Sequence, residues 1–169
     1  NAAENAQTIG DSFYDNSVLN VRGGSGTGAY GRIQTAGPQT ITATGSTTLA
    51  GGTGSGADAL LISTGPTQQT IRPGSLTMSG GGSATTSAIA QIQAAGRQNL
   101  TNGGSLTMTG GPGADSFARI FSEQNQFFSF NGAVTLTGAG VEGAPVANSG
   151  AVIEGHGQSL SCFNCVITL

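Results

Sequence analysis

QNLTNGGSLTMTGG, from Gln98 to Gly111, is the clearest copy of a repeated unit in this chain. It opens with a Gln two residues before an apolar residue, passes through a Gly-rich corner and continues as an alternation of apolar and polar residues. Related stretches stand upstream as QTIRPGSLTMSGG, from Gln69 to Gly81, and downstream as QFFSFNGAVTLTG, from Gln126 to Gly138. Self-similarity at a fixed period is the signature of a repeat architecture.

The Gln-x-apolar pair marks six copies of the repeat, spaced 28 to 32 residues apart. The Gln residues are Gln7, Gln39, Gln69, Gln98, Gln126 and Gln158, and their apolar partners are Ile9, Ile41, Ile71, Leu100, Phe128 and Leu160. The predicted coils span residues 1–37, 38–66, 67–96, 97–124 and 125–157, followed by an incomplete coil at 158–169. We expect the 169 residues to form a single domain.

Each copy contains three short strand-like pieces. The first is the Gln-x-apolar piece, and the second alternates strictly, as in Leu76-Thr77-Met78-Ser79, which predicts a strand with one buried face. The third carries a small-x-apolar pattern, at Gly31 and Ile33, Leu60 and Ile62, Ala90 and Ile92, Ala118 and Ile120, Ala151 and Ile153. Residues 84–98 also fit a helical spacing, but the alignment of the repeats and their Thr and Gly content favour a strand.

These features predict an all-β, single-domain β-solenoid of about six coils, with roughly 30 residues and three short strands per coil. Equivalent residues then stack in ladders about 4.8 Å apart. Two apolar ladders face inward, the six partners of the Gln residues and the column Val21, Leu49, Met78, Met108, Leu136 and Leu169. The Gln side chains are expected to form a third, hydrogen-bonded ladder. The alternative, an antiparallel β-sandwich, gives no reason for a repeat of this length.

The composition restricts the function. Charged residues make up 8% of the chain, the net charge is −3 and all five basic residues are Arg, which argues against a nucleic-acid partner. No apolar run approaches the roughly 20 residues of a membrane-spanning helix. The chain begins at Asn1 without Met, which fits removal of a leader. Low charge, missing Lys and paired cysteines together predict an extracellular or cell-surface protein.

The Gln-x-Ile, Gly-Ser-Leu-Thr-Met and Gly-Gly elements resemble the repeats of bacterial secreted β-solenoid proteins of the filamentous-haemagglutinin-like adhesin type. The similarity covers nearly the whole chain, from Gln7 to Leu169. It implies a secreted β-solenoid that works at a cell surface. The chain departs from that family in having fewer than six full coils and no separate secretion domain.

The two cysteines, Cys162 and Cys165, form a C-x-x-C motif near the C-terminus. A redox centre needs a strand-to-helix context, and a zinc site needs four ligands, whereas the chain offers these two Cys and one His. A structural disulfide between Cys162 and Cys165 is the favoured interpretation. An intersubunit disulfide and free thiols are the alternatives.

No catalytic, metal or cofactor site is predicted, and we expect the protein not to be an enzyme. His156 stands between two Gly residues without a neighbouring base or nucleophile, so it is expected to be a corner residue facing solvent. Asp58 and Asp115 lie two coils apart, about 10 Å along the axis, so they do not form the paired carboxylates of a glycosidase. The acidic residues are therefore expected to be solvated, and Gly110–Asp115 is too distorted a match for a calcium-binding repeat.

An outward ladder of Thr48, Thr77, Thr107, Thr135 and Thr168 follows from the strand alternation, beside a second column of Ala50, Ser79, Thr109 and Thr137. Flat Thr arrays can bind ice or polysaccharide, but Thr also favours strands for its β-propensity alone. An adhesin-type or glycan- or ice-binding module using Thr48, Thr77, Thr107 and Thr135 is the second functional hypothesis.

The first functional hypothesis is a structural subunit of an extracellular bacterial filament. Uncapped ends of a solenoid expose unpaired strand edges, and head-to-tail contacts between them propagate into an open polymer of identical copies. The last copy stops after its second strand, and the N-terminal segment is expected to supply the missing strand of the preceding molecule. The predicted interface residues are Asn1, Ala2, Ala3, Glu4, Asn5, Ala6 and Gln7 at one end and Val166, Ile167, Thr168 and Leu169 at the other.

Overall fold

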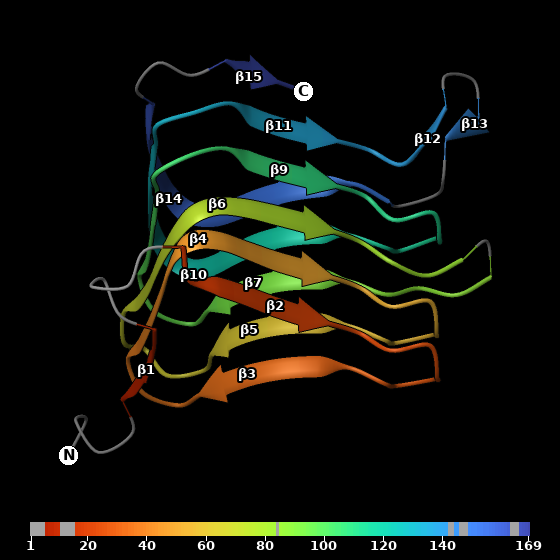
Figure 1. The fold of residues 1–169 in the computed structure, drawn as a ribbon, viewed down its shortest axis with the longest axis horizontal. Coiled ribbons are helices and arrows are strands. Elements are labelled where there is room, and N and C mark those ends of the chain that lie inside the picture. The colour runs from red at the N-terminus through yellow and green to blue at the C-terminus, as the bar shows by residue number, and fades with distance from the viewer. Residues whose placement is uncertain (1–5, 11–15, 84, 142–143, 146–148, 163–165) are drawn as a thin grey trace.

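The protein is a β-solenoid of about five turns with roughly 29 residues per turn, as a computed structural model of the chain shows (Figure 1). The structure describes residues 6–10, 16–83, 85–141, 144–145, 149–162 and 166–169. Strands stack in layers from β3 at one end to β15 at the other (Figure 1). The predicted fold class is confirmed.

The strands form three faces of one 13-stranded sheet in which every described pairing is parallel. Face 1 consists of β1 (Gln7–Ile9), β8 (Gln98–Asn102), the first parts of β4 (Gln39–Ala50) and β6 (Gln69–Ser79), and the second parts of β10 (Ala118–Phe130) and β14 (Ala151–Cys162). Face 2 consists of β2 (Val18–Arg22), the second parts of β4 and β6, β9 (Leu106–Thr109), β11 (Val134–Thr137) and β15 (Ile167–Thr168).

Face 3 consists of β3 (Gly31–Thr35), β5 (Ala59–Ser63), β7 (Ala90–Ala94) and the first parts of β10 and β14. The structure therefore places residues 90–94 of the helix alternative in a strand, as expected. The longest corner insertion, in the fifth copy, carries a small antiparallel hairpin of β12 (Gly140–Val141) and β13 (Ala144–Pro145), which projects from the stack (Figure 1).

The register between layers is the one that the Gln marker predicts. Gln7 pairs with Gln39, Gln39 with Gln69, Gln69 with Gln98, Gln98 with Gln126, and Gln126 with Gln158. On face 2, the predicted inner column runs in register from Val21 through Leu49, Met78 and Met108 to Leu136. Parallel strands pair equivalent positions of the repeat, so each interior column consists mainly of apolar residues, whose types vary from layer to layer.

The interior is a single apolar core between the three faces. The inner side chains of the middle layers, including Ile41, Ile71, Met78, Ile92, Leu100 and Met108, are almost completely buried. Burial of apolar side chains at about 25 cal/mol per Å² is the main force that holds the layers together. The core is capped at neither end by a described helix, since the described residues contain none.

One predicted position on face 3 is wrong. The sequence pattern assigns Leu60 and Ile62 to the inward positions of the second layer, but Ala59 pairs with Gly31 and Ala90, and Leu61 pairs with Ile33 and Ile92. Ala59 and Leu61 are fully buried. The first inward position of face 3 holds Gly31, Ala59, Ala90, Ala118 and Ala151 in successive layers, so a Leu there would meet alanines packed for a small neighbour.

Thr47 is a polar residue in an apolar column. It lies in register between Leu19 and Leu76 on the inner side of face 2, where it is 1% exposed. Its hydroxyl oxygen is buried without a hydrogen-bond partner in the part of the chain that the structure describes. An unsatisfied buried polar group costs about 1–3 kcal/mol.

Replacing Thr47 with valine is therefore expected to raise the free energy of unfolding by about 1 kcal/mol, because the side chain keeps its shape and loses the orphan hydroxyl. Thermal denaturation followed by circular dichroism would measure it as a rise in Tm of about 3 °C. The neighbouring Thr48→Val, on the outer side of the same strand, is the control and should change stability by less than about 0.5 kcal/mol. A T47V variant less stable than the parent would contradict the prediction.

Candidate functional site

The C-terminal end of the solenoid exposes the last members of the inner columns. Leu160 on face 1 is 51% exposed, and Ile167 and Leu169 on face 2 are 48% and 93% exposed, while their counterparts in the middle layers are buried. Val166, just before β15, is 69% exposed. The predicted interface residues Val166, Ile167, Thr168 and Leu169 thus lie together on an apolar edge, whose outer side no described strand pairs with.

The N-terminal end presents the matching edge of the first layer. Gln7 and Ile9 of β1 are half-buried, whereas their partners Gln39 and Ile41 in the next layer are buried. Of the predicted interface residues at this end, the structure describes Ala6 and Gln7, and Ala6 is exposed. Asn1, Ala2, Ala3, Glu4 and Asn5 lie outside the described residues, so the strand predicted for them is untested.

A ladder of glutamine side chains runs through the whole stack on the inner side of face 1. Each Gln donates its amide N–H to the amide oxygen of the Gln in the layer before it. The Nε2 to Oε1 distances are 2.7 Å from Gln39 to Gln7, 2.7 Å from Gln69 to Gln39, 2.7 Å from Gln98 to Gln69, 3.0 Å from Gln126 to Gln98 and 3.1 Å from Gln158 to Gln126. The expected hydrogen-bonded ladder is confirmed.

Backbone carbonyls in the strands of face 3 accept further hydrogen bonds from the ladder. Gln69 and Gln158 donate additional hydrogen bonds to backbone carbonyls of Gln93 and Ile153, at 3.2 Å each, and Gln98 donates one to Phe121 at 3.4 Å. The four middle glutamines are completely buried. Buried amides are stable only when their donors and acceptors are satisfied, so the ladder fixes the vertical register of the coils.

The ladder has a direction, and its two ends are complementary. Within the described residues, no donor reaches Oε1 of Gln158, and no acceptor in the ladder takes the amide N–H of Gln7. An amide N–H of the Gln7 type placed one layer above Gln158 would continue the ladder with the same polarity. The acceptor at Gln158 in the last layer is therefore complementary to the donor at Gln7 in the first layer.

The backbone edges are complementary in the same way. Gln7, Gln39 and Gln69 donate their backbone N–H groups to the next layer, to the carbonyls of Pro38, Gln68 and Arg97 at 2.8, 3.2 and 2.9 Å. Successive N–H groups in a strand point to opposite sides, so the N–H of Thr8 points out of the stack. At the other end, Val134 donates to the carbonyl of Val166 at 2.9 Å, which leaves the N–H of Ile167 pointing outward.

The predicted Thr ladder is in register on the outer side of face 2. Thr48, Thr77, Thr107, Thr135 and Thr168 pair in successive layers, and the column begins with Asn20. The second column also holds, from Ala50 through Ser79 and Thr109 to Thr137, with Arg22 as its first member. Ligand binding by this face remains a prediction.

Two acidic residues are not simply solvated, which corrects the expectation from sequence. Glu154 forms an ion pair with Arg119 of the layer before, and the Arg119 guanidinium also lies 4.5 Å from the centre of the Phe121 ring. An oxygen of the Asp58 side chain accepts the backbone N–H of Ile89 at 2.9 Å. Both carboxylates thus hold adjacent layers together, a role that spacing along the chain does not reveal.

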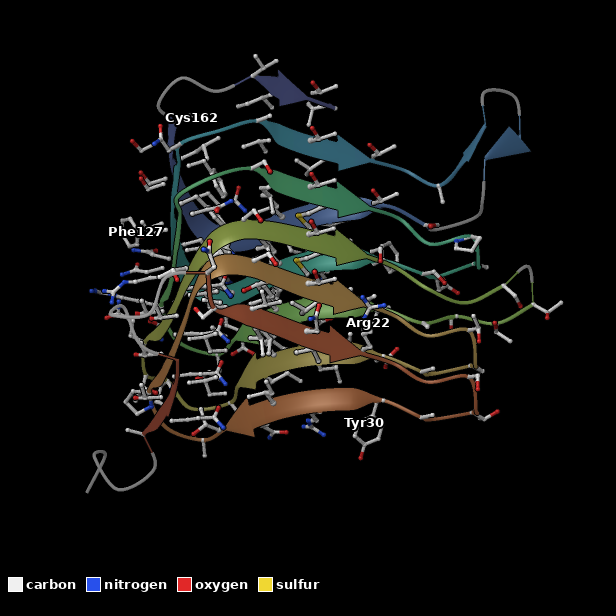
Figure 2. All side chains as sticks on the ribbon, viewed as in Figure 1. Arg22, Tyr30, Phe127 and Cys162 are labelled. Carbon is white, nitrogen blue, oxygen red and sulfur yellow. The ribbon has the colours of Figure 1, made fainter. Side chains whose placement is uncertain are left out.

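The remaining candidate residues are dispersed. His156 is exposed at the junction of the two parts of β14. Cys162, labelled in Figure 2, ends the same strand and does not carry a free thiol, but Cys165 lies outside the described residues, so a bond between the two stays a prediction. Among the residues that the structure describes, there is no group of three metal-ligating side chains and no helix that could cross a membrane.

Sequence reasoning missed one surface feature. Phe127 lies on the outer side of face 1, is 46% exposed and projects sideways from the stack (Figure 2). The alternation in Gln126-Phe127-Phe128-Ser129-Phe130 contains the signal, since Gln126, Phe128 and Phe130 are the inward residues.

Comparisons with protein-family models, with curated proteins and with solved structures find no match to this chain.

Proposed function

We propose that this protein is the structural subunit of an extracellular bacterial filament, assembled by head-to-tail stacking of β-solenoids. The observation that carries the proposal is the match between the two ends of the stack. The last layer offers an amide oxygen at Gln158 and outward backbone groups at Ile167, and the first layer offers the amide of Gln7 and the outward N–H of Thr8.

The apolar side chains at the C-terminal end also support stacking. Each of Leu160, Ile167 and Leu169 has a counterpart of the first layer in the same column, namely Ile9, Leu19 and Val21. A second copy placed with its first layer on the last layer of the first would bury both sets. Apolar burial and parallel backbone pairing then act between molecules as they act between layers within one.

Face 3 has five described strands where faces 1 and 2 have six, so stacked copies leave one position on face 3 to fill. We assign it to the segment before Gln7 of the incoming copy. Thr35, Ala94 and Ser122 end their strands four residues before a ladder Gln, and Ala3 stands at that spacing before Gln7. The extracellular location rests on the low charge and absent Lys of the chain.

Electron microscopy of the purified protein is expected to show unbranched filaments with an axial rise of about 29 Å per subunit, that is, six layers of about 4.8 Å each. Thr8→Pro should give particles of single subunits with an unchanged Tm, because proline removes an edge donor that points out of the stack. Thr8→Val keeps that N–H and is the matched control, which should still polymerise. Only monomers from the parent protein, or undiminished filaments from T8P, would overturn this mode of assembly.

A further inference from the structure

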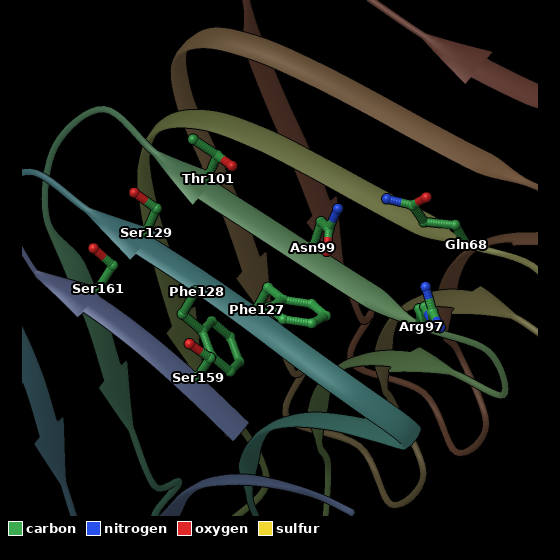
Figure 3. A pocket seen from close by; sticks show the side chains of 9 residues that line it. All are labelled: Gln68, Arg97, Asn99, Thr101, Phe127, Phe128, Ser129, Ser159 and Ser161. Carbon is green, nitrogen blue, oxygen red and sulfur yellow. The ribbon is translucent and has the colours of Figure 1, made fainter. Parts of the chain in front are cut away.

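A hollow lies on the outer surface of face 1 and extends from the turn before β6 to β14 in the last layer. It has a volume of about 390 Å³ and is lined by side chains of β8, β10 and β14 and of the turns before β6 and β8 (Figure 3). The lining is polar except for Phe127 and the edge of Phe128. Ser159 and Ser161 belong to the last layer, the edge on which the proposed filament contact forms, whereas Arg97, Asn99 and Phe127 lie in the layers before it.

Phe127 is the centre of this hollow. It stands in register between Asn99 of β8 and Ser159 of β14, in a column that holds threonine in the first three layers, at Thr8, Thr40 and Thr70. Its ring points from β10 toward Asn99 and Arg97 (Figure 3). An aromatic ring left open in a polar column is a platform for a flat ligand with an apolar face.

A row of hydroxyl groups runs beside the ring. Thr101, Ser129 and Ser161 occupy the next outward column in three successive layers, and all three are exposed (Figure 3). Layers are about 4.8 Å apart, so the hydroxyls form an evenly spaced line along the solenoid axis. No described residue takes a hydrogen bond from them or gives one to them, which leaves them available to a ligand.

The charge of the hollow is positive. Arg97 lines it and is exposed, and the register that pairs Ile71 with Leu100 places Arg72, also exposed, beside Thr101. Among the described residues, the outward columns of face 1 contain no Asp or Glu, and Glu123 lies outside them, at the corner toward face 3. The one ion pair between described residues, Arg119 with Glu154, belongs to face 3. A guanidinium without an acidic partner is suited to a carboxylate, which it can bind with two parallel hydrogen bonds.

We propose that this hollow binds an acidic oligosaccharide, a chain of sugars that carry carboxylates. The apolar face of one sugar ring packs on Phe127, its hydroxyls bond to Asn99 and the row of Ser and Thr side chains, and a carboxylate pairs with Arg97. The line of hydroxyls along the axis sets the direction of the sugar chain. Neutral sugars lack the carboxylate, and acidic peptides lack the ring face and the hydroxyls, so both bind more weakly.

The test is titration calorimetry of the purified protein with oligogalacturonate. Two further probes are the same oligomer after chemical reduction of its carboxylates, and polyglutamate. We expect binding of oligogalacturonate, at least tenfold weaker binding of each of the other two, and at least tenfold weaker binding by Arg97→Ala and by Phe127→Ala. Both side chains are exposed, so both variants should keep the parent Tm.

Matched controls come from other exposed positions. Arg22→Ala removes a cation from the outer side of face 2, and Tyr30→Ala removes an aromatic ring that is 58% exposed before β3. Both should leave affinity unchanged. No binding of oligogalacturonate, equal binding of polyglutamate, or equal losses in R22A and Y30A would overturn the proposal. If the affinity for oligogalacturonate fell only when Thr77, Thr107 and Thr135 were substituted, the proposal would also be overturned. Binding would then be assigned to the Thr ladder of face 2.

Discussion

Replacing Gln98 with alanine is expected to lower the free energy of unfolding by about 4 kcal/mol. The substitution leaves two buried groups without partners, Oε1 of Gln69 and the amide N–H of Gln126, and each costs about 1–3 kcal/mol. The cavity left by the side chain adds to this loss, because Gln98 is completely buried. Thermal and denaturant-induced unfolding would measure it, with a fall in Tm of about 10 °C.

Two controls separate the ladder from packing. Gln98→Leu refills most of the space but restores neither hydrogen bond, so it should remain about 3 kcal/mol less stable than the parent. Gln158→Ala removes the last rung, where the side chain is exposed and water can replace the lost bond, and should cost less than about 1 kcal/mol. If Q98L were as stable as the parent, the ladder would contribute register but no net stability.

Replacing Gly81 with alanine should destabilise the protein by about 3 kcal/mol or more. A Cβ at this corner would lie well inside 3.0 Å of backbone atoms of Gly51 and Gly52 in the layer below. Backbone cannot rotate aside as a flexible side chain can, so the two layers must separate locally and lose contacts on either side. The measurement is the same pair of unfolding experiments.

Gly138→Ala is the control, at the position of the fifth layer that is equivalent to Gly80. Gly138 follows the corresponding strand of the fifth layer, but the nearest atom to its added Cβ is the Ser149 carbonyl oxygen, at the ordinary distance of 3.9 Å. Stability should stay unchanged or rise by up to about 1 kcal/mol, because alanine restricts the unfolded chain. Equal losses in G81A and G138A would show that corner glycines act through backbone freedom and not through the close approach of layers.

Most of the fold could be predicted because its information is local and repeated. The position of each ladder Gln and the alternation after it fix which residues point inward, and parallel stacking pairs equivalent positions. The assignment failed at the second layer of face 3, where Ala59-x-Leu61 and Leu60-x-Ile62 both fit a small- or apolar-x-apolar pattern. The tightness of the alanine column decided between them, and that is a property of the neighbouring layers.

The candidate interface was predictable to a smaller extent. The incomplete sixth repeat in the sequence predicts an interface at the C-terminal edge. The structure adds that Leu160 and Ile167 are about half exposed there. The direction of the Gln ladder and the outward N–H of Thr8 follow only from which atom of each layer meets which atom of the next. A sequence specifies an amide side chain but not the way in which it is turned.

The β-solenoid, its glutamine ladder and its apolar inner columns can be read from the amino-acid sequence, because period and alternation are properties of consecutive residues. Which outward side chains meet depends on the three-dimensional arrangement of the layers. Asn99, Phe127 and Ser159 are about 30 residues apart in the chain and adjacent on face 1, and Arg119 meets Glu154 in the same way on face 3. The corner loops differ in length from layer to layer, so these neighbours are set by hydrogen-bonded register between layers and by the packing that enforces it.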